Sequence, residues 1–199
     1  LTELYFLNLG VNNLVGAIPT EIRNLTELEF LDLGVNNLSG TIPPVFGHLP
    51  ILCYLDIHSN QINGYINSAM GDLQSMQKLD LSNNYISGTI PHELTQLTQL
   101  EYLNLSLNKL SGKIMPNIQY LSSLSVLDLS HNNLSGSIPP QVLDSDKLTI
   151  VDLSHNLFSG NIPLELGCFT FLRHLDLSSN TLTGHIPSTL VFQCQINLS

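Results

Sequence analysis

The sequence predicts an α/β solenoid, a stack of short coils that share one parallel β-sheet. Asparagine recurs every 24 residues in eight consecutive units, with glycine four positions later and isoleucine six positions later. Leucine or a close substitute stands five and three positions before each asparagine. The recurring asparagines are Asn12, Asn36, Asn60, Asn84, Asn108, Asn132, Asn156 and Asn180. One such unit cannot bury its apolar residues alone, so the pattern indicates a stack.

Each unit is expected to begin with a short strand. In the fourth repeat, Leu79 and Leu81 alternate with Lys78, Asp80 and Ser82. Side chains of a strand point alternately to its two faces, so the leucines point inward and the polar residues outward. Stacked strands of this kind form a parallel sheet on the concave face.

The rest of the unit returns the chain to the next strand. We expect the asparagine to turn the chain inside the coil, where its amide satisfies buried backbone groups. The glycine marks a position where a Cβ is unfavourable, and Ile-Pro starts the return path with a fixed φ. Leu94, Leu97 and Leu100 then close the convex side at helical or 3₁₀ spacing.

The repeats carry a narrower pattern, Leu-Ser/Thr-Gly-x-Ile-Pro, as within 127–139 and 175–187. They resemble the plant-specific leucine-rich repeat, and the resemblance covers essentially the whole chain. It implies a right-handed superhelix with a second short strand, as in ectodomains of plant receptor-like kinases and receptor-like proteins and in polygalacturonase-inhibiting proteins. The departures from the pattern are few: Asn67 and Met115 replace proline, Ser145 replaces an apolar residue, and Val15 replaces Ser/Thr.

We expect residues 1–199 to form one solenoid of eight 24-residue units plus the start of a ninth, whose strand at 196–199 arrives three residues early. Cysteine-bearing end caps are usual in the family, and neither is found here, so the chain is interpreted as an uncapped fragment. The sequence contains no G-x-G-x-x-G, H-R-D or D-F-G motif. We therefore expect this chain to have no enzymatic activity. In members of the family that have a serine/threonine kinase domain, that domain would follow the repeats.

Charge and hydropathy exclude two kinds of partner. Six Lys+Arg against sixteen Asp+Glu give a formal net charge of −10, whereas nucleic-acid affinity depends on Lys and Arg. No apolar run approaches the roughly 18 residues of a membrane helix, so no direct membrane insertion is expected.

The three cysteines do not form a disulfide framework. Cys53 and Cys194 lie six coils apart and cannot pair. Cys168 and Cys194 lie on neighbouring coils, so they either form a disulfide or remain free thiols.

Five Asn-x-Ser/Thr sequons favour a secreted or ectodomain setting, on the extracellular side of the plasma membrane or in the apoplast. The predicted glycosylation sites are Asn24, Asn37, Asn104, Asn133 and Asn197.

Ligand recognition is expected where the repeats differ, at the outward strand position six before each asparagine. Aromatic residues there would form a stripe of roughly 20 Å across strands about 4.8 Å apart, suited to an extended peptide or a partner loop. Alternatively, these side chains only stiffen neighbouring strands, or Phe6 and Phe30 lie beneath a lost cap. The predicted ligand- or partner-binding residues are Phe6, Phe30, Tyr54, Lys78, Tyr102 and His174.

Aspartate or asparagine recurs four positions before each repeat asparagine, as in Asp32, Asp56 and Asp80. A catalytic carboxylate pair needs two different environments, and this column repeats one, so we interpret it as structural, with an acidic inner face attractive to basic ligands. No metal-ligand spacing emerges, and neither a metal nor a cofactor is predicted. His131 and His155, on adjacent coils, are either a pH-sensing pair or ordinary repeat residues.

The resemblance and the stripe together predict an extracellular recognition domain that binds a peptide or protein on its concave and lateral face, with a co-receptor as a further candidate partner. The alternative is a secreted protein similar to the polygalacturonase inhibitors, which bind an enzyme.

Overall fold

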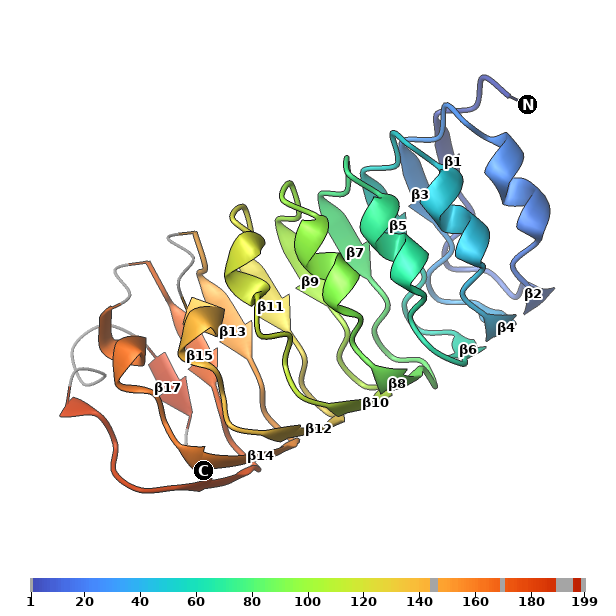
Figure 1. Ribbon diagram of the computed structural model, residues 1–199. Coiled ribbons are helices and arrows are strands. Elements are labelled where there is room, and N and C mark those ends of the chain that lie inside the picture. The colour runs from blue at the N-terminus through green and yellow to red at the C-terminus, as the bar shows by residue number, and fades with distance from the viewer. Residues whose placement is uncertain (1, 144–146, 169–170, 189–194, 198–199) are drawn as a thin grey trace.

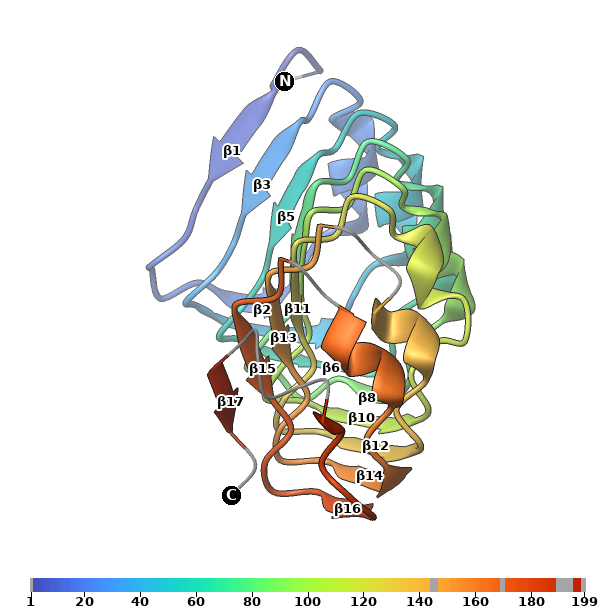
Figure 2. The same ribbon diagram turned by 90° about the vertical axis from the view of Figure 1, so that its left-hand side faces the viewer.

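The computed structural model is a single stack of coils (Figure 1) and describes residues 2–143, 147–168, 171–188 and 195–197. Each complete coil contributes one strand to a long sheet, a second strand to a lateral sheet, and a 3₁₀ helix. Seen nearly along the stack, the long sheet lies on one side and the 3₁₀ helices on the other (Figure 2). This arrangement confirms the predicted solenoid.

The long sheet is parallel and follows chain order. Pairing keeps equivalent repeat positions opposite each other, so Leu31 lies opposite Leu55, 24 residues later. At the last pair, Ile196 lies opposite Leu175, only 21 residues away. The nine strands are β1 (Phe6–Asn8), β3 (Phe30–Asp32), β5 (Tyr54–Asp56), β7 (Lys78–Asp80), β9 (Tyr102–Asn104), β11 (Val126–Asp128), β13 (Ile150–Asp152), β15 (His174–Asp176) and β17 (Gln195–Asn197). We call the outer surface of this sheet the concave face.

A second set of strands forms at the Leu-x-Gly-x-Ile segments, as the resemblance implied. It divides into a three-stranded and a five-stranded sheet, between which Tyr65 and Ser87 form an isolated bridge. The strands are β2 (Val15–Ala17), β4 (Asn37–Thr41) and β6 (Gln61–Asn63), then β8 (Ser87–Thr89), β10 (Lys109–Gly112), β12 (Asn133–Gly136), β14 (Leu157–Asn161) and β16 (Thr181–Thr183). We call the outer surface of these strands the lateral face.

Short 3₁₀ helices form the convex side, as the spacing of Leu94, Leu97 and Leu100 predicted. Asn67, which replaces the usual proline, caps its helix by accepting a hydrogen bond from the Ala69 N–H at 2.9 Å. Neighbouring helices approach closely at Gly71, where a Cβ would lie 2.5 Å from the Glu93 carbonyl oxygen. The helices are η1 (Thr20–Asn24), η2 (Pro44–His48), η3 (Ser68–Asp72), η4 (His92–Gln96), η5 (Ile118–Tyr120), η6 (Pro140–Leu143) and η7 (Leu164–Cys168).

The core runs along the inside of the stack as one cluster of buried leucine, isoleucine and methionine side chains. The strand residues Leu55, Leu79 and Leu103 are completely buried, and so are Leu94 and Leu97 on the convex side. Because every coil repeats these positions, each coil buries its apolar residues against the two coils beside it.

One local conformation was not predicted. The residue directly before each repeat asparagine is left-handed, with φ between 52° and 54°. Serine, asparagine and histidine occupy this position in some repeats, but Val11 and Val35 occupy it in the first two. A β-branched residue at positive φ is a steric outlier, so these two turns hold local strain.

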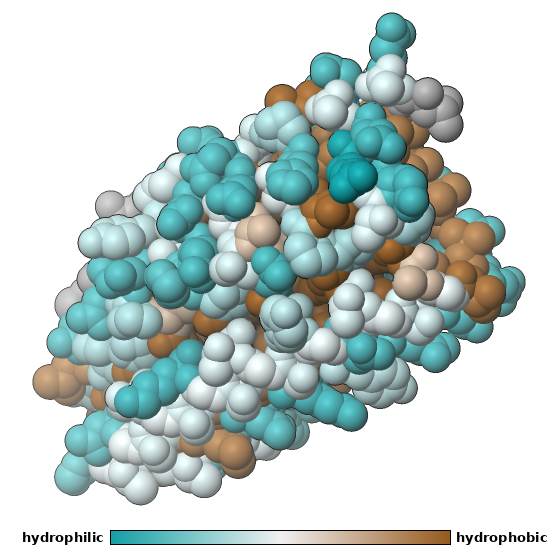
Figure 3. Space-filling model, turned by 45° about the vertical axis from the view of Figure 1, so that its right-hand side comes forward, coloured by the Kyte–Doolittle hydropathy of each residue, from teal (hydrophilic) through white to brown (hydrophobic). Residues whose placement is uncertain are grey.

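Exposed apolar side chains gather at the end of the stack nearest the N-terminus (Figure 3). Val11 and Val15 are 78% and 75% exposed there. Among the described residues, no helix has the length and apolar character that crossing a bilayer requires.

Candidate functional site on the concave face

Three aromatic rings stack across the first strands of the long sheet. Phe6 and Phe30 have ring centroids 4.4 Å apart at 13°, and Phe30 and Tyr54 have centroids 4.0 Å apart at 18°. Strand pairing places the three residues directly opposite one another. Stacking therefore follows from the repeat register, since adjacent strands are about as far apart as stacked rings.

Lys78 continues this row on the next strand. Its Nζ lies 4.5 Å from the ring centroid of Tyr54 and 5.2 Å from that of Tyr102, so the ammonium lies between two aromatic neighbours. We call Phe6, Phe30, Tyr54, Lys78 and Tyr102 the concave ladder. The structure thus brings five of the six predicted binding residues into one contiguous row.

The Lys78 ammonium already has partners within the protein. It donates hydrogen bonds to the Tyr54 hydroxyl at 2.8 Å and to Asp56 Oδ2 at 3.2 Å. Burial works against the charged form, yet these hydrogen bonds and the Asp56 carboxylate raise the pKa of Lys78. Burial also raises the pKa of Tyr54, despite the hydrogen bond from Lys78. Lys78 therefore orders the ladder and is less free to receive a ligand carboxylate than a lone surface lysine would be.

His174, the sixth predicted residue, lies apart from the ladder. It stands on β15, three strands beyond Tyr102, and Val126 and Ile150 occupy the positions between them. The ligating atoms of His174, Asp152 and Asp176 lie within 4.8 Å of one another. The structure therefore places His174 in an acidic setting and the ladder in an aromatic one.

The aspartate column has the structural role that its repetition suggested. The Asp32 carboxylate accepts a hydrogen bond from the N–H of Gly34 at 2.9 Å, and Asp128 accepts one from the N–H of Ser130 at 3.0 Å. These bonds close the turn that follows each strand.

The outward orientation predicted for Asp80 does not expose it to solvent: Asp56 and Asp80 are only 4% and 7% exposed. The long side chains of the ladder cover them, as the hydrogen bond from the Tyr102 hydroxyl to Asp80 Oδ2 at 3.4 Å shows. Beside the ladder, the concave face consequently exposes less negative charge than the sequence predicted.

Two carboxylates of the aspartate column have pKa values that are shifted in opposite directions. Burial opposes the ionised form of Asp56, but hydrogen bonds from His58 and Lys78 lower its pKa. Burial and the negative charge of Asp152 raise the pKa of Asp128. The C-terminal part of the concave face is thus the part where carboxylates repel one another.

Two carboxylate and histidine groups have atoms close enough to share an ion: Asp56 with His58 and Asp80, and Asp152 with His174 and Asp176. Sequence spacing did not reveal them because each group combines neighbouring strands. In the first group, Asp56 Oδ1 and His58 Nδ1 are already 2.5 Å apart, and the Lys78 ammonium lies against Asp56 Oδ2. An internal cation therefore already balances the carboxylate charge there.

The predicted glycosylation sites fall in different surroundings. Asn24, Asn37 and Asn133 are exposed, with Asn37 and Asn133 at the starts of β4 and β12. Asn104 is partly buried on the concave face, where its Oδ1 accepts hydrogen bonds from Ser106. The side chain of Asn197 lies outside the part of the chain that the structure describes.

The cysteines and the histidine pair have no role in the ladder. Burial and nearby Glu29 raise the pKa of the Cys53 thiol, which disfavours the reactive thiolate. The disulfide considered between Cys168 and Cys194 falls outside the described side chains. His131 and His155 stack with ring centroids 4.1 Å apart at 11°.

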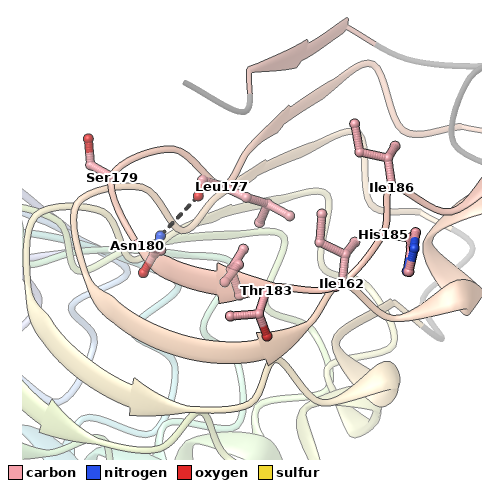
Figure 4. Close-up of a pocket in the computed structure, with 9 residues that line it drawn as sticks. Ile162, Leu177, Ser179, Asn180, Thr183, His185 and Ile186 are labelled. Atoms are coloured by element: carbon pink, nitrogen blue, oxygen red, sulfur yellow. Dashed lines mark hydrogen bonds between the residues drawn. The ribbon is translucent and has the colours of Figure 1, made fainter.

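A cavity of about 410 Å³ lies at the last repeats (Figure 4). Asn180 lines it and donates to the Leu177 carbonyl at 3.1 Å. Its apolar lining includes Ile186, which is 58% exposed, whereas its repeat equivalent Ile138 is 2% exposed. The apolar part of the lining, Ile162, Leu177, Leu182 and Ile186, therefore consists of repeat positions that form the core in other coils.

Comparison with known proteins agrees with this geometry. The model for "Leucine-rich repeat region" matches residues 1–115, and the model for "Leucine Rich Repeat" matches 123–144, 147–169 and 171–192. Comparison with curated protein sequences finds no match.

Several solved structures are similar. The plant peptide hormone receptor RGFR1 in complex with RGF2 is 41% identical over 95% of this chain and 30% of that chain, with a TM-score of 0.94. The Arabidopsis receptor kinase HAESA ectodomain, bound to an IDA peptide hormone, is 35% identical over 99% of this chain and 33% of that chain, with a TM-score of 0.95. A plant ice-binding protein is 30% identical over 93% of this chain and 67% of that chain, with a TM-score of 0.73.

The chain spans about a third of the length of the two receptor ectodomains. Their similarity covers nearly all of it, however, and the family model covers more than half. The family models and the solved structures thus agree with the solenoid described above, and the chain belongs to the leucine-rich repeat family.

Proposed function

We propose that this chain is part of the ligand-recognition ectodomain of a plant receptor-like kinase or receptor-like protein, on the extracellular side of the plasma membrane. Its role there is to bind a peptide or protein, and it carries out no chemistry itself. Similar structures include receptors bound to peptide hormones and one such complex with the co-receptor SERK1. Because the fold also occurs in an ice-binding protein, fold similarity alone does not carry the proposal.

The observation that carries it is the concave ladder. Its side chains are exposed or half-buried, and they cross the strands in an unbroken row. Five strands at about 4.8 Å give a row of roughly 20 Å, the length of about six extended residues. Aromatic side chains are favoured anchors in interfaces because they bury a large area with few rotatable bonds.

The experiment compares peptide binding by the ladder and by a matched variant. A phage-displayed random dodecapeptide library is selected on the immobilised chain, and the enriched peptides are synthesised and titrated. The test variant, Phe30→Val with Tyr102→Val, removes two aromatic rings from the ladder. Valine is chosen because Val126 occupies the same repeat position in this chain. We expect a loss of at least tenfold in affinity, because anchor residues dominate interface energy.

Tyr120→Ser is the control, since Tyr120 is 57% exposed on η5, on the convex side. It should leave the affinity unchanged, and thermal melts should show that all three proteins are folded. Equal affinity of the wild type and the ladder variant for every selected peptide would remove the ladder as the binding site.

A further inference from the structure

Charge is divided unevenly between the two faces of the solenoid. The chain contains 16 Asp+Glu and only 6 Lys+Arg, yet no lateral strand from β2 to β16 carries an acidic residue. Two of the six cations lie here instead, Lys109 at the start of β10 and Lys113 directly after its end. Both are exposed, and neither forms an ion pair within the described part of the chain. The middle of the lateral face is therefore positive in an otherwise acidic protein.

Two exposed tyrosines lie beside these lysines. Tyr85 and Tyr65 are 52% and 63% exposed, and Lys109 Nζ lies 5.1 Å from the Tyr85 ring centroid. Strand pairing places Tyr65 opposite Ser87, and Ser87 opposite Lys109. Tyr65 and Lys109 are thus in one row, about 10 Å apart across two strand spacings. We call Tyr65, Tyr85, Lys109 and Lys113 the lateral patch.

A small cavity adjoins this patch. It measures about 60 Å³ and is lined by Tyr65 together with Thr41, Ile42, Pro44 and Asn67. It lies between the segments that follow β4 and β6, and its size suits a small apolar group such as part of a proline ring. The patch thus combines positive charge, aromatic surface and a shallow apolar recess.

We propose that the lateral patch binds an acidic, proline-containing segment of a partner protein, separately from the ligand on the concave ladder. Carboxylates of that segment lie against Lys109 and Lys113, because opposite charges across an interface fix both partner and register. A proline of the same segment, about 10 Å from the carboxylate at Lys109, packs against Tyr65 at the recess, since aromatic-lined grooves favour proline-rich chains. Asp128, Asp152 and Asp176, which are partly exposed toward the C-terminal end of the concave face, repel the same segment, which favours the lateral face.

A polypeptide fits the patch better than an acidic polysaccharide. Sugar rings are bound by stacking on open aromatic faces, but the Lys109 ammonium lies over the Tyr85 ring. That ring therefore contributes its edge and hydroxyl, which suit backbone and carboxylate oxygens.

The test measures fluorescence anisotropy of a fluorescein-labelled dodecapeptide of alternating Glu and Pro. The patch variant is Lys109→Asn with Lys113→Thr. These replacements are chosen because Asn37 and Thr41 occupy the same repeat positions in another coil. The charge-matched control is Arg23→Asn with Lys147→Asn, which removes the same two charges outside the lateral strands. All proteins are made without glycans, and thermal melts check their folding.

We expect saturable binding to the wild type, about tenfold weaker binding to the patch variant, and binding by the control within twofold of the wild type. Binding should also weaken as salt rises from 50 to about 300 mM, because exposed charges are screened. A dodecapeptide of alternating Gln and Pro should bind at least tenfold more weakly than the acidic one.

Equal affinities of the patch variant and the charge-matched control would overturn the proposal. So would binding of a uronic-acid oligosaccharide, with the same dependence on Lys109 and Lys113, in place of the acidic peptide. Since the ladder variant Phe30→Val/Tyr102→Val retains the lateral patch, it should bind the acidic peptide like the wild type.

Discussion

Asn60 Oδ1 accepts a hydrogen bond at 2.9 Å from the backbone N–H of Leu38, which lies 22 residues earlier in the preceding coil. The Asn60 amide nitrogen also donates to the carbonyl of Leu33 in that coil at 3.0 Å, and to the carbonyls of Ile57 and His58 in its own coil at 3.1 Å. One side chain thus closes its own turn and joins two coils.

Asn60→Ala should destabilise the solenoid by about 2–4 kcal/mol, because it leaves several buried backbone groups without a partner. The free energy of unfolding from urea titration, followed by circular dichroism, measures this loss.

Asn12→Ala is the matched control. Asn12 occupies the same repeat position and donates to the carbonyls of Leu9 and Gly10, but its hydrogen bonds are exposed to solvent. Water can replace them, so the expected loss is below about 1 kcal/mol. Equal losses in the two variants would contradict the role given to burial.

The sequence predicted correctly those features that belong to repeat positions where the same residue type recurs in coil after coil. Leu79 and Asn84 are buried, and Gly64 has a positive φ, as their recurrence indicated. A repeated position has the same neighbours in every coil, so its residue type is informative about its environment.

The features that the sequence did not reveal depend on side chains from different coils. The partners of Lys78 are Tyr54 and Asp56, 24 and 22 residues away, and the burial of Asp80 depends on how Tyr102 lies across it. The left-handed residue before each asparagine also escaped notice, because valine, serine and histidine all occupy it. Residue type cannot mark a conformation that the surrounding turn imposes.

Val35→Asn should stabilise the protein by about 1 kcal/mol. Val35 has φ of 53° and is 41% exposed, so the substitution relieves strain without removing a buried side chain. Asparagine adopts the left-handed region more readily than a β-branched residue, and Asn83 already does so two repeats later. Differential scanning calorimetry would detect the rise in melting temperature.

Leu107→Asn distinguishes strain relief from a general benefit of polar residues. Leu107 has φ of 54° and is 49% exposed, but it is not β-branched, so its gain should be smaller. A gain as large as that of Val35→Asn would show that removal of exposed apolar surface, and not backbone strain, is responsible.

Asp56→Asn should destabilise the protein by about 2–3 kcal/mol at pH 7, because the ionised carboxylate is buried against Lys78. The folded-state pKa of Asp56 is lowered from 3.8. Its stabilisation is therefore fully present above the unfolded pKa and is lost as pH falls through the folded pKa. Urea titrations between pH 7 and about pH 2 should show the difference between wild type and variant shrinking below pH 4. Because His58 also contacts Asp56, the comparison is repeated in a His58→Asn background.

Asp128→Asn provides the opposite sign in the same column. The folded-state pKa of Asp128 is raised by burial and by Asp152, so ionisation of Asp128 disfavours folding above that pKa. Asparagine keeps an oxygen for the hydrogen bonds from Ser130, and the variant should be as stable as the wild type or more stable at pH 7. As pH falls, the wild type gains stability relative to Asp128→Asn, whereas it loses stability relative to Asp56→Asn. If the stability difference from the wild type changed with pH in the same direction for both variants, the interpretation would be wrong. Lys78 would then not separate aspartates whose charge it neutralises from aspartates that repel one another.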